Sequence, residues 1–247
     1  MNYVVDNWAV AIAVANEEQD FPPFHAALKA VLDRLGNGTV YFIVDKASKD
    51  RTLEVCQKCS AADPRFVTIW APENRNLVDA YRRGLKEALD RGHRIIIEMD
   101  AGMSHDPNAI PMFLRVLSEG NECAFGSRYI NGGSNLGSPL KRRFFSKTGT
   151  ILARVLLGGK LKDMTSGFEG FHAHVVEKLL QVEMRSRAHF YQTEVRYLLR
   201  NFRTMEVPIH YRAPSPRVSA GAITNALATL FYYTRLRITF RAPAVGS

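Results

Sequence analysis

Short apolar runs alternate with amphipathic segments through the first half of the chain, and this alternation most constrains its fold. The runs cover residues 8–15, 39–45, 66–70 and 94–100. Between the last two, apolar side chains recur at helical spacing from Leu77 to Leu89, and Gly92 ends the pattern. Strands separated by helices form right-handed parallel crossovers. The alternation therefore predicts an α/β fold with a mostly parallel central sheet flanked by helices.

The second half of the chain has a different composition. Residues 122–129 form one more predicted strand, and a turn-rich loop follows at 131–139. Helices are then predicted at 141–157, 173–181, 190–202 and 220–238, with a strand-like run at 204–212. A length of 247 residues without a linker or repeat suits one large domain. We therefore predict a single domain over residues 1–247.

Polar side chains follow several of the predicted strands. Asn16-Glu17-Glu18 comes after the first strand, Asp45 and Asp100 end the second and fourth, and Gly126-Ser-Arg128 ends the fifth. Each acid alone is equally consistent with a helix cap. In open parallel sheets, however, ligands bind at the carboxyl ends of the strands, beside helix N-termini. The set as a whole predicts a ligand site at this edge.

The charge of the chain favours polyanionic partners. Lys and Arg number 33 against 24 Asp and Glu, giving a net charge of +9. Diphosphates and anionic lipid fit this sign, whereas the basic residues are dispersed without a recognition motif, so we expect no nucleic-acid partner. The N-terminus lacks the basic region of a signal peptide, and no apolar stretch approaches the ~20 residues that span a bilayer. We expect a cytoplasmic protein that can touch the membrane surface peripherally.

Cys56 and Cys59 are the only closely spaced cysteines. Neither a second pair nor a suitably spaced histidine pair completes a zinc site. We expect two reduced thiols one helical turn apart, and their role stays open.

Six motifs follow one another along almost the whole chain. They are Val14-Ala-Asn-Glu-Glu18, Val44-Asp-Lys-Ala-Ser-Lys-Asp-Arg-Thr52, Glu98-Met-Asp-Ala-Gly-Met-Ser-His-Asp-Pro107, Gly126-Ser-Arg-Tyr129, Thr165-Ser-Gly-Phe168 and Glu206-Val-Pro-Ile209. In this order they resemble glycosyltransferase family 2, and most closely its dolichyl-phosphate mannose synthase branch. The resemblance implies a Rossmann-like GT-A fold, the fold of nucleotide-diphospho-sugar transferases. Residues 1–130 would form the nucleotide-sugar half, and 131–247 the acceptor half with its C-terminal helix.

The resemblance also implies a donor site at the strand ends. The acid after the second strand, Asp45, would contact the base or ribose of the nucleotide, with Glu18 nearby. The implied nucleotide-sugar residues are Ala15, Asn16, Glu18, Asp45, Lys46, Arg75, Asp100, Ala101 and Gly102.

Two departures from the family pattern bear on metal binding. Asp-Asp-Gly-Ser is replaced by Asp45-Lys-Ala-Ser48, and Asp-Ala-Asp by Asp100-Ala-Gly102, so each motif lacks one acid. Mg²⁺ or Mn²⁺ at a diphosphate takes one or two carboxylates together with phosphate oxygens and water. We expect weak metal binding through Asp100, helped by Ser104. The alternative is a metal-independent or inactive site.

The expected acceptor chemistry follows from charge. A sugar hydroxyl needs a general base, whereas a lipid phosphate is already an anionic nucleophile and needs cations. Family-like positions for these cations are Arg128, Arg142, Arg143 and Arg212, with Ser146 beside them, although each arginine is also consistent with a solvated basic surface. Glu194 is the reserve base for a hydroxyl acceptor. Asp100, Arg128 and Glu194 are thus the expected catalytic residues.

Together these features predict inverting transfer of a hexose from GDP-mannose or a UDP-sugar to polyprenyl or dolichyl phosphate. Two alternatives stay open: a family member acting on a hydroxyl of a glycan or secondary metabolite, and a degenerate, nonenzymatic subunit, which Lys46 and Gly102 would fit. The helix at 220–238 mixes Ile223, Leu227 and Phe231 with arginines. It is expected either to cover the core or to lie on a lipid surface.

Overall fold

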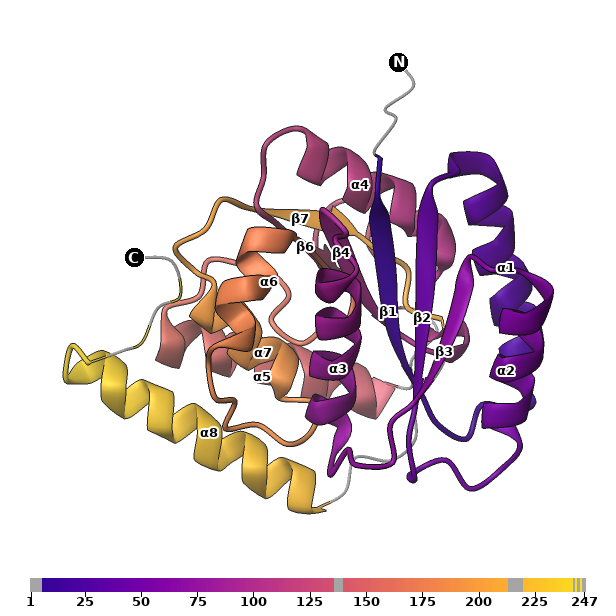
Figure 1. Ribbon diagram of the computed structural model, residues 1–247. Helices are drawn as coiled ribbons and strands as arrows, with labels where there is room; N and C mark the ends of the chain where they lie inside the picture. The colour runs from indigo at the N-terminus through magenta and orange to yellow at the C-terminus, as the bar shows by residue number, and fades with distance from the viewer. Residues whose placement is uncertain (1–5, 136–139, 213–219, 242, 244, 246–247) are drawn as a thin grey trace.

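The computed structural model describes residues 6–135, 140–212, 220–241, 243 and 245 (Figure 1). Its first half alternates strands and helices as the sequence predicts. The elements are β1 (Trp8–Val14), α1 (Phe21–Leu35), β2 (Gly38–Val44), α2 (Thr52–Ala62), β3 (Phe66–Trp70), α3 (Leu77–Asp90) and β4 (Ile95–Asp100). Two short 3₁₀ turns, η1 (Gly102–Ser104) and η2 (Pro107–Ala109), then lead into α4 (Ile110–Ser118).

The second half adds three strands and four helices within the described residues. They are β5 (Cys123–Ser127), α5 (Leu140–Leu157), β6 (Glu169–His172), α6 (Ala173–Leu180), α7 (Tyr191–Leu198), β7 (Thr204–Pro208) and α8 (Ala220–Ile238).

One seven-stranded sheet has the order β3-β2-β1-β4-β6-β5-β7. All pairings are parallel except those of β6, which runs antiparallel to both β4 and β5. β6 was not predicted, because four residues that include a glycine carry no periodic signal. It brings the second half of the chain into the same sheet as the predicted nucleotide-sugar half. The α/β, GT-A-like prediction is confirmed.

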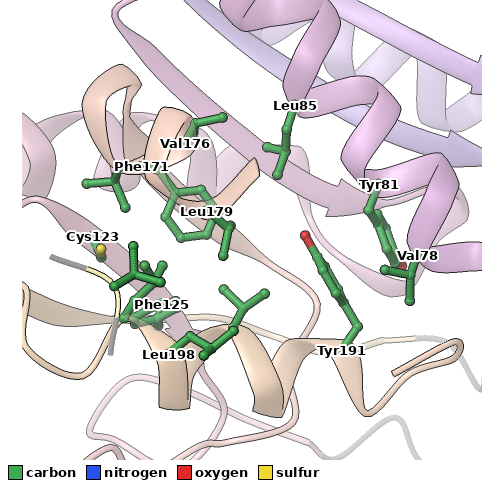
Figure 2. Close-up of a cluster of buried hydrophobic side chains, with 14 of the residues drawn as sticks. Val78, Tyr81, Leu85, Cys123, Phe125, Phe171, Val176, Leu179, Tyr191 and Leu198 are labelled. Atoms are coloured by element: carbon green, nitrogen blue, oxygen red, sulfur yellow. The ribbon is translucent and has the colours of Figure 1, made fainter. Parts of the chain in front are cut away.

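Successive side chains of each strand point to opposite faces of the sheet, and helices cover both faces. Val10, Ile12 and Phe42 pack with α1, α2 and α4 on one face. Tyr41, Ile43 and their neighbours pack with helices α3 and α5 to α8 on the other. Figure 2 shows this second cluster, where Tyr81 of α3 faces Tyr191 of α7.

Helix α8 combines the two roles that its sequence left open. Leu230 and Tyr233 are buried in the core, whereas Ile223, Leu227 and Phe231 are exposed on its outer side. The helix packs on α5 and extends along the outside of the molecule (Figure 1). Within the described part of the chain, no helix combines the length and apolar character needed to cross a bilayer.

Candidate active site

The loops that leave β1 and β2 are tied together by Asn16. Its side-chain oxygen accepts from the backbone N–H of Lys49 at 2.8 Å, and its amide nitrogen donates to the carbonyl of Ala47 at 3.2 Å. Asn16 has a φ of 58°, in the left-handed region that asparagine tolerates better than most residues. The following backbone N–H groups then reach the β2–α2 loop.

Asp50 anchors that loop. Its carboxylate accepts from the backbone N–H of Glu18 and Thr52 and from the hydroxyls of Ser48 and Thr52. Desolvation alone would raise the pKa of Asp50, but these hydrogen bonds hold the pKa at about 2. Asp50 is therefore ionised, and protein donors already engage its carboxylate oxygens.

Two predicted donor residues lie on the same loops. Glu18 forms an ion pair with Arg51, whose Nε donates to Glu18 Oε1 at 2.7 Å. Asp45 lies at the end of β2, is largely buried, and accepts from the backbone N–H of Ala47 at 2.8 Å. The neighbouring Lys46 is exposed, and its carbonyl accepts from Lys49 Nζ. Their nucleotide contacts stay predictions.

Asp100 lies at the carboxyl end of β4, next to β1. Its Oδ1 accepts a hydrogen bond from the hydroxyl of Tyr81, and 31% of its side chain is exposed. Gly167 packs against the carboxylate, since a Cβ on that glycine would lie 2.9 Å from Asp100 Oδ2. The carboxylate is thus oriented from one side and open on another.

Glu17 occupies the space beside Gly102. A Cβ built on Gly102 would lie 2.9 Å from Glu17 Oε2, and Gly102 itself has a φ of +73°. Desolvation and, after it, the negative charges of Asp20, Asp100 and Asp50 together raise the pKa of Glu17 to about 7. Glu17 thus lies beside Asp100 and Gly102; the strand-end pattern included it, whereas the donor residues implied by the family resemblance were its neighbours Asn16 and Glu18.

Arg128, after β5, is held by a buried carboxylate. Its Nε and Nη2 donate to Asp163 at 2.7 and 2.8 Å, and Nη2 also donates to the hydroxyl of Thr165. That hydroxyl lies 3.0 Å from Ser146 Oγ, which in turn accepts from the hydroxyl of Tyr129 at 3.3 Å. The predicted residues Arg128 and Ser146 are therefore joined through the loop at 163–168.

A cavity of about 490 Å³ opens beside this network. The lining residues combine cations, amides and an exposed aromatic ring; they are Arg128, Tyr129, Gly133, Ser134, Asn135, Arg143, Phe144 and Lys147. Two predicted acceptor residues, Arg128 and Arg143, thus face one cavity. Lys147 was not predicted, although it lies one helical turn after Arg143.

The other predicted cations are elsewhere or undescribed. Arg212 is half-exposed and pairs with Asp106 at 2.8 Å, and its backbone N–H donates to the carbonyl of Ser104. Arg142 lies in α5, but its side chain is outside the described residues. Arg75 is exposed at the start of α3, pairs with Asp79, and lines a second cavity of about 510 Å³.

Glu194 is fully buried. Its oxygens accept from the backbone N–H of Arg185 and Ser186 and from the hydroxyl of Tyr233. These contacts connect α7 to α8 and to the preceding loop. A catalytic role for Glu194 stays a prediction, and the contacts it makes here are structural.

A buried polar network lies behind Asp100 and was missed from the sequence. Glu98 and Glu169 are directly opposed on β4 and β6, and Arg196 of α7 forms an ion pair with Glu169. Tyr191 donates to Glu98 at 3.3 Å, and its ring stacks on Tyr81 with centroids 5.4 Å apart. Burial raises the pKa of Glu98 well above its ordinary value, with Glu169 and Asp100 adding to the effect. Burial therefore favours the neutral form of Glu98.

Residues 9–180, more than half of the chain, match the profile of glycosyl transferase family 2. The chain belongs to glycosyl transferase family 2. Among its family relatives, polyprenol monophosphomannose synthase of Mycolicibacterium smegmatis is 31% identical over 192 residues, which cover 76% of this chain and 72% of the relative. Undecaprenyl-phosphate mannosyltransferase of Micrococcus luteus is 27% identical over 193 residues, covering 76% and 79%.

Solved structures support the same fold. Glucosyl-3-phosphoglycerate synthase from Mycobacterium tuberculosis in complex with UDP superimposes with a TM-score of 0.66 at 15% identity, covering 93% of this chain and 80% of the other. A second structure of that synthase holds Mn²⁺, UDP and phosphoglyceric acid, with a TM-score of 0.64 at 14% identity. At this identity the likeness shows the fold alone, so this chain is a family 2 glycosyltransferase with a GT-A-like fold.

The donor atoms of this family 2 site fit a divalent cation only together with a ligand. No group of three or more His, Cys, Asp or Glu side chains in the described ranges is arranged to hold a metal. Asp100 offers a partly exposed carboxylate at the sheet edge, packed on one side by Gly167. Hard oxygens suit Mg²⁺ or Mn²⁺, and diphosphate oxygens and water would supply the remaining ligands. Ser104 lies in η1, where its carbonyl accepts from Arg212.

Proposed function

We propose that this family 2 glycosyltransferase transfers a hexose, mannose by analogy with its relatives, from a nucleotide sugar to a polyprenyl phosphate. One observation carries the proposal: the loop at 163–168 contacts both predicted half-sites. Thr165 accepts from Arg128 beside the cationic cavity, while Gly167 packs against Asp100 at the sheet edge. Donor and acceptor sites are thus neighbours across a single short loop.

The donor side uses the carboxyl ends of β1, β2 and β4. In this proposal Asp45 binds the nucleoside and Asp100 binds the diphosphate. A divalent cation bound by Asp100 would neutralise the diphosphate as it leaves. Tyr81 orients the Asp100 carboxylate through its hydroxyl.

The acceptor side matches a phosphate attached to an apolar chain. Arg128 and Arg143 can donate to phosphate oxygens, Lys147 adds a third positive charge, and Phe144 presents an exposed ring at the same cavity. Asp163 fixes the Arg128 fork in place, so the guanidinium needs no reorganisation when the phosphate binds.

The reaction follows from these positions. One oxygen of the lipid phosphate attacks C1 of the sugar, a new C1–O bond forms, and the bond from C1 to the nucleotide diphosphate breaks with its electron pair on the diphosphate. The nucleophile is already an anion, so no residue has to remove a proton from it. Attack opposite the leaving group inverts C1 and gives a β-linked glycosyl phosphate from an α-linked donor. Positioning and electrostatics supply the rate.

The outer face of α5 and α8 supports peripheral contact with a bilayer. Exposed apolar side chains lie along both packed helices, namely Phe144, Ile151, Leu152, Val155, Ile223, Leu227, Phe231 and Ile238. Lys147 and Arg235 are exposed on the same helices, and Arg241 follows α8. Arg237, in contrast, donates to the carbonyls of Val155 and Leu156 at the end of α5. A substrate headgroup in the lipid interface would be delivered next to Phe144 and the cationic cavity.

The decisive experiment incubates purified protein with GDP-mannose, UDP-glucose or UDP-N-acetylglucosamine, together with a short-chain polyprenyl phosphate and Mn²⁺. We expect sugar label to move into the organic phase with one donor, and the anomeric NMR signal of the product to be β. Transfer of label only in a parallel incubation with a soluble glycan in place of the lipid phosphate would indicate a hydroxyl acceptor. No turnover with intact nucleotide binding would support a nonenzymatic subunit.

A further inference from the structure

The missing carboxylate at position 102 has a structural counterpart in Glu17. Gly102 is buried, and the place of its absent side chain is taken by the Glu17 carboxyl group, whose Oε2 would lie 2.9 Å from a Cβ on residue 102. Side-chain oxygens 3.0 Å or less from a Cβ are overlapping contacts. A side chain at 102 would therefore displace the Glu17 carboxyl group from this position.

The backbone of Glu17 is held in place independently of any ligand. Its N–H donates to the hydroxyl of Thr52 at 2.8 Å, and its carbonyl accepts from the N–H of Phe21 at the start of α1. The strand register aligns Ala13 of β1 with Asp100 of β4, so Glu17 follows the strand beside Asp100. Both carboxyl groups thus emerge at the same edge of the sheet.

The surroundings of Glu17 supply no positive charge. Within the described residues no Lys, Arg or His forms an ion pair with it, whereas the neighbouring Glu18 pairs with Arg51. Two carboxyl groups at one edge of the sheet, with no cation of the described residues paired to Glu17, suit a site completed by a bound cation.

We infer that Glu17 replaces the carboxylate absent at Gly102 and acts, with Asp100, as the second protein ligand of a divalent cation that binds with the nucleotide diphosphate. The inference rests on the proposed function, since the diphosphate and water would complete the coordination. The second metal-binding carboxylate would then come from the β1–α1 loop, through Glu17, and not from the β4–η1 turn, where Gly102 lies. The chain can then retain metal binding although its Asp-Ala-Gly motif lacks one acid.

Mn²⁺ binding tests this inference without an activity assay. Free Mn²⁺ is measured by its EPR signal during titration of the protein in excess GDP, and again in excess UDP. Three isosteric variants are compared with wild type: Glu17→Gln, Asp100→Asn and Asp20→Asn. Asp20 is an exposed acid whose charge acts on Glu17, and it caps α1 without a side-chain hydrogen bond, so it reports general loss of negative charge.

We expect Glu17→Gln and Asp100→Asn each to weaken Mn²⁺ at least tenfold, and Asp20→Asn to weaken it less than threefold. Circular dichroism confirms that each variant is folded. If Asp100→Asn weakens Mn²⁺ binding but Glu17→Gln has no larger effect than Asp20→Asn, then Glu17 is not a metal ligand. That result would leave the proposed function intact. Unchanged Mn²⁺ binding in Asp100→Asn would instead remove the metal from the proposed function.

Discussion

The guanidinium of Arg128 and the carboxylate of Asp163 form two parallel hydrogen bonds of 2.7 and 2.8 Å, both side chains being nearly excluded from solvent. The pair leaves Arg128 fixed at the wall of the cationic cavity. A fixed fork binds phosphate without first losing side-chain entropy, which is the physical basis of its proposed acceptor role.

Replacing Arg128 by lysine should separate acceptor from donor binding. The ammonium group can pair with Asp163, but it cannot at the same time offer phosphate the Nη1 donors that remain on Arg128 after Nε and Nη2 have bonded Asp163 and Thr165. We expect KM for the polyprenyl phosphate to rise about tenfold or more, with the donor Kd unchanged. Steady-state kinetics and donor calorimetry measure the two effects. Arg115→Lys, on the exposed side of α4, is the matched control, and a changed donor Kd with normal acceptor KM would contradict the assignment.

Tyr81→Phe should lower kcat by orienting Asp100 less well. The substitution removes the hydroxyl that donates to Asp100 and keeps the ring that stacks on Tyr191. The loss of one hydrogen bond to a charged group corresponds to about 1.5–3 kcal/mol, or roughly a tenfold to hundredfold fall in rate. Tyr191→Phe is the control, because its hydroxyl contacts Glu98 and not Asp100. Equal losses of kcat in both variants would point to a packing effect.

Stability should depend on pH through Glu98. Its pKa is raised in the folded protein, chiefly by burial and then by Glu169, so above the ordinary glutamate pKa the folded state binds a proton that the unfolded state has lost. Stability therefore falls as pH rises from about 4.5. Glu98→Gln should remove this loss, making Tm less sensitive to pH between 5 and 8.

Glu169, which lies opposite Glu98 in the sheet, provides a variant for comparison with Glu98→Gln. Glu169→Gln removes the carboxyl group that pairs with buried Arg196, which should cost about 3–5 kcal/mol. Burial also raises the pKa of Glu169, to about 7, so this variant should lower stability and reduce its pH slope as well, whereas Glu98→Gln should reduce the slope alone. Urea unfolding at pH 5, 6, 7 and 8 measures both variants. A Glu98→Gln protein with the same pH slope as wild type would show that Glu98 is ionised in the fold.

Gly102→Asp should not restore the family's metal site. The residue has a left-handed φ of +73°, and its new Cβ would meet Glu17 at 2.9 Å. Backbone strain of this kind costs about 1–3 kcal/mol, and the added charge repels its neighbours. We expect lower Tm and no gain in Mn²⁺ affinity.

Gly36→Asp is the control for Gly102→Asp, because it introduces the same backbone strain without a contact to another side chain. Gly36 has a similar φ of +66°, but nothing lies within 4 Å of its built Cβ. The difference in Tm between the two variants therefore reports the surroundings of Gly102, namely the contact with Glu17 and the repulsion from nearby carboxyl groups. Tighter Mn²⁺ binding by Gly102→Asp would mean that the β4–η1 turn rearranges freely.

The outer face of α8 should contribute to membrane binding. The triple variant Ile223→Ser, Phe231→Ser, Ile238→Ser removes exposed apolar surface without touching the buried Leu230 and Tyr233, so Tm should be unchanged. We expect co-sedimentation with anionic vesicles to fall several-fold, since apolar insertion and cationic contacts act together. Met205→Ser, on the exposed side of β7, is the control. Equal sedimentation of wild type and triple variant would exclude this face.

Local patterns in the sequence determined the elements and the positions of the strand ends. The apolar runs ending at Val44 and Asp100 have a period and length that strands require, and α8 begins and ends where its helical pattern does. The carboxyl ends of parallel strands share one edge, so the pattern also placed Asp45 and Asp100 at the same edge of the sheet. The motif order led to glycosyl transferase family 2, which the comparison confirms.

Tertiary structure alone decided which distant side chains meet. The four-residue β6 inserts antiparallel between β4 and β5, and only this places Glu169 opposite Glu98 and lets the preceding loop reach both Asp100 and Arg128. Likewise, only the packing of β1 beside β4 puts Glu17 in the space left by Gly102. Such contacts depend on strand order and crossover geometry, which arise from burial summed over the whole sheet, and no local periodicity encodes them.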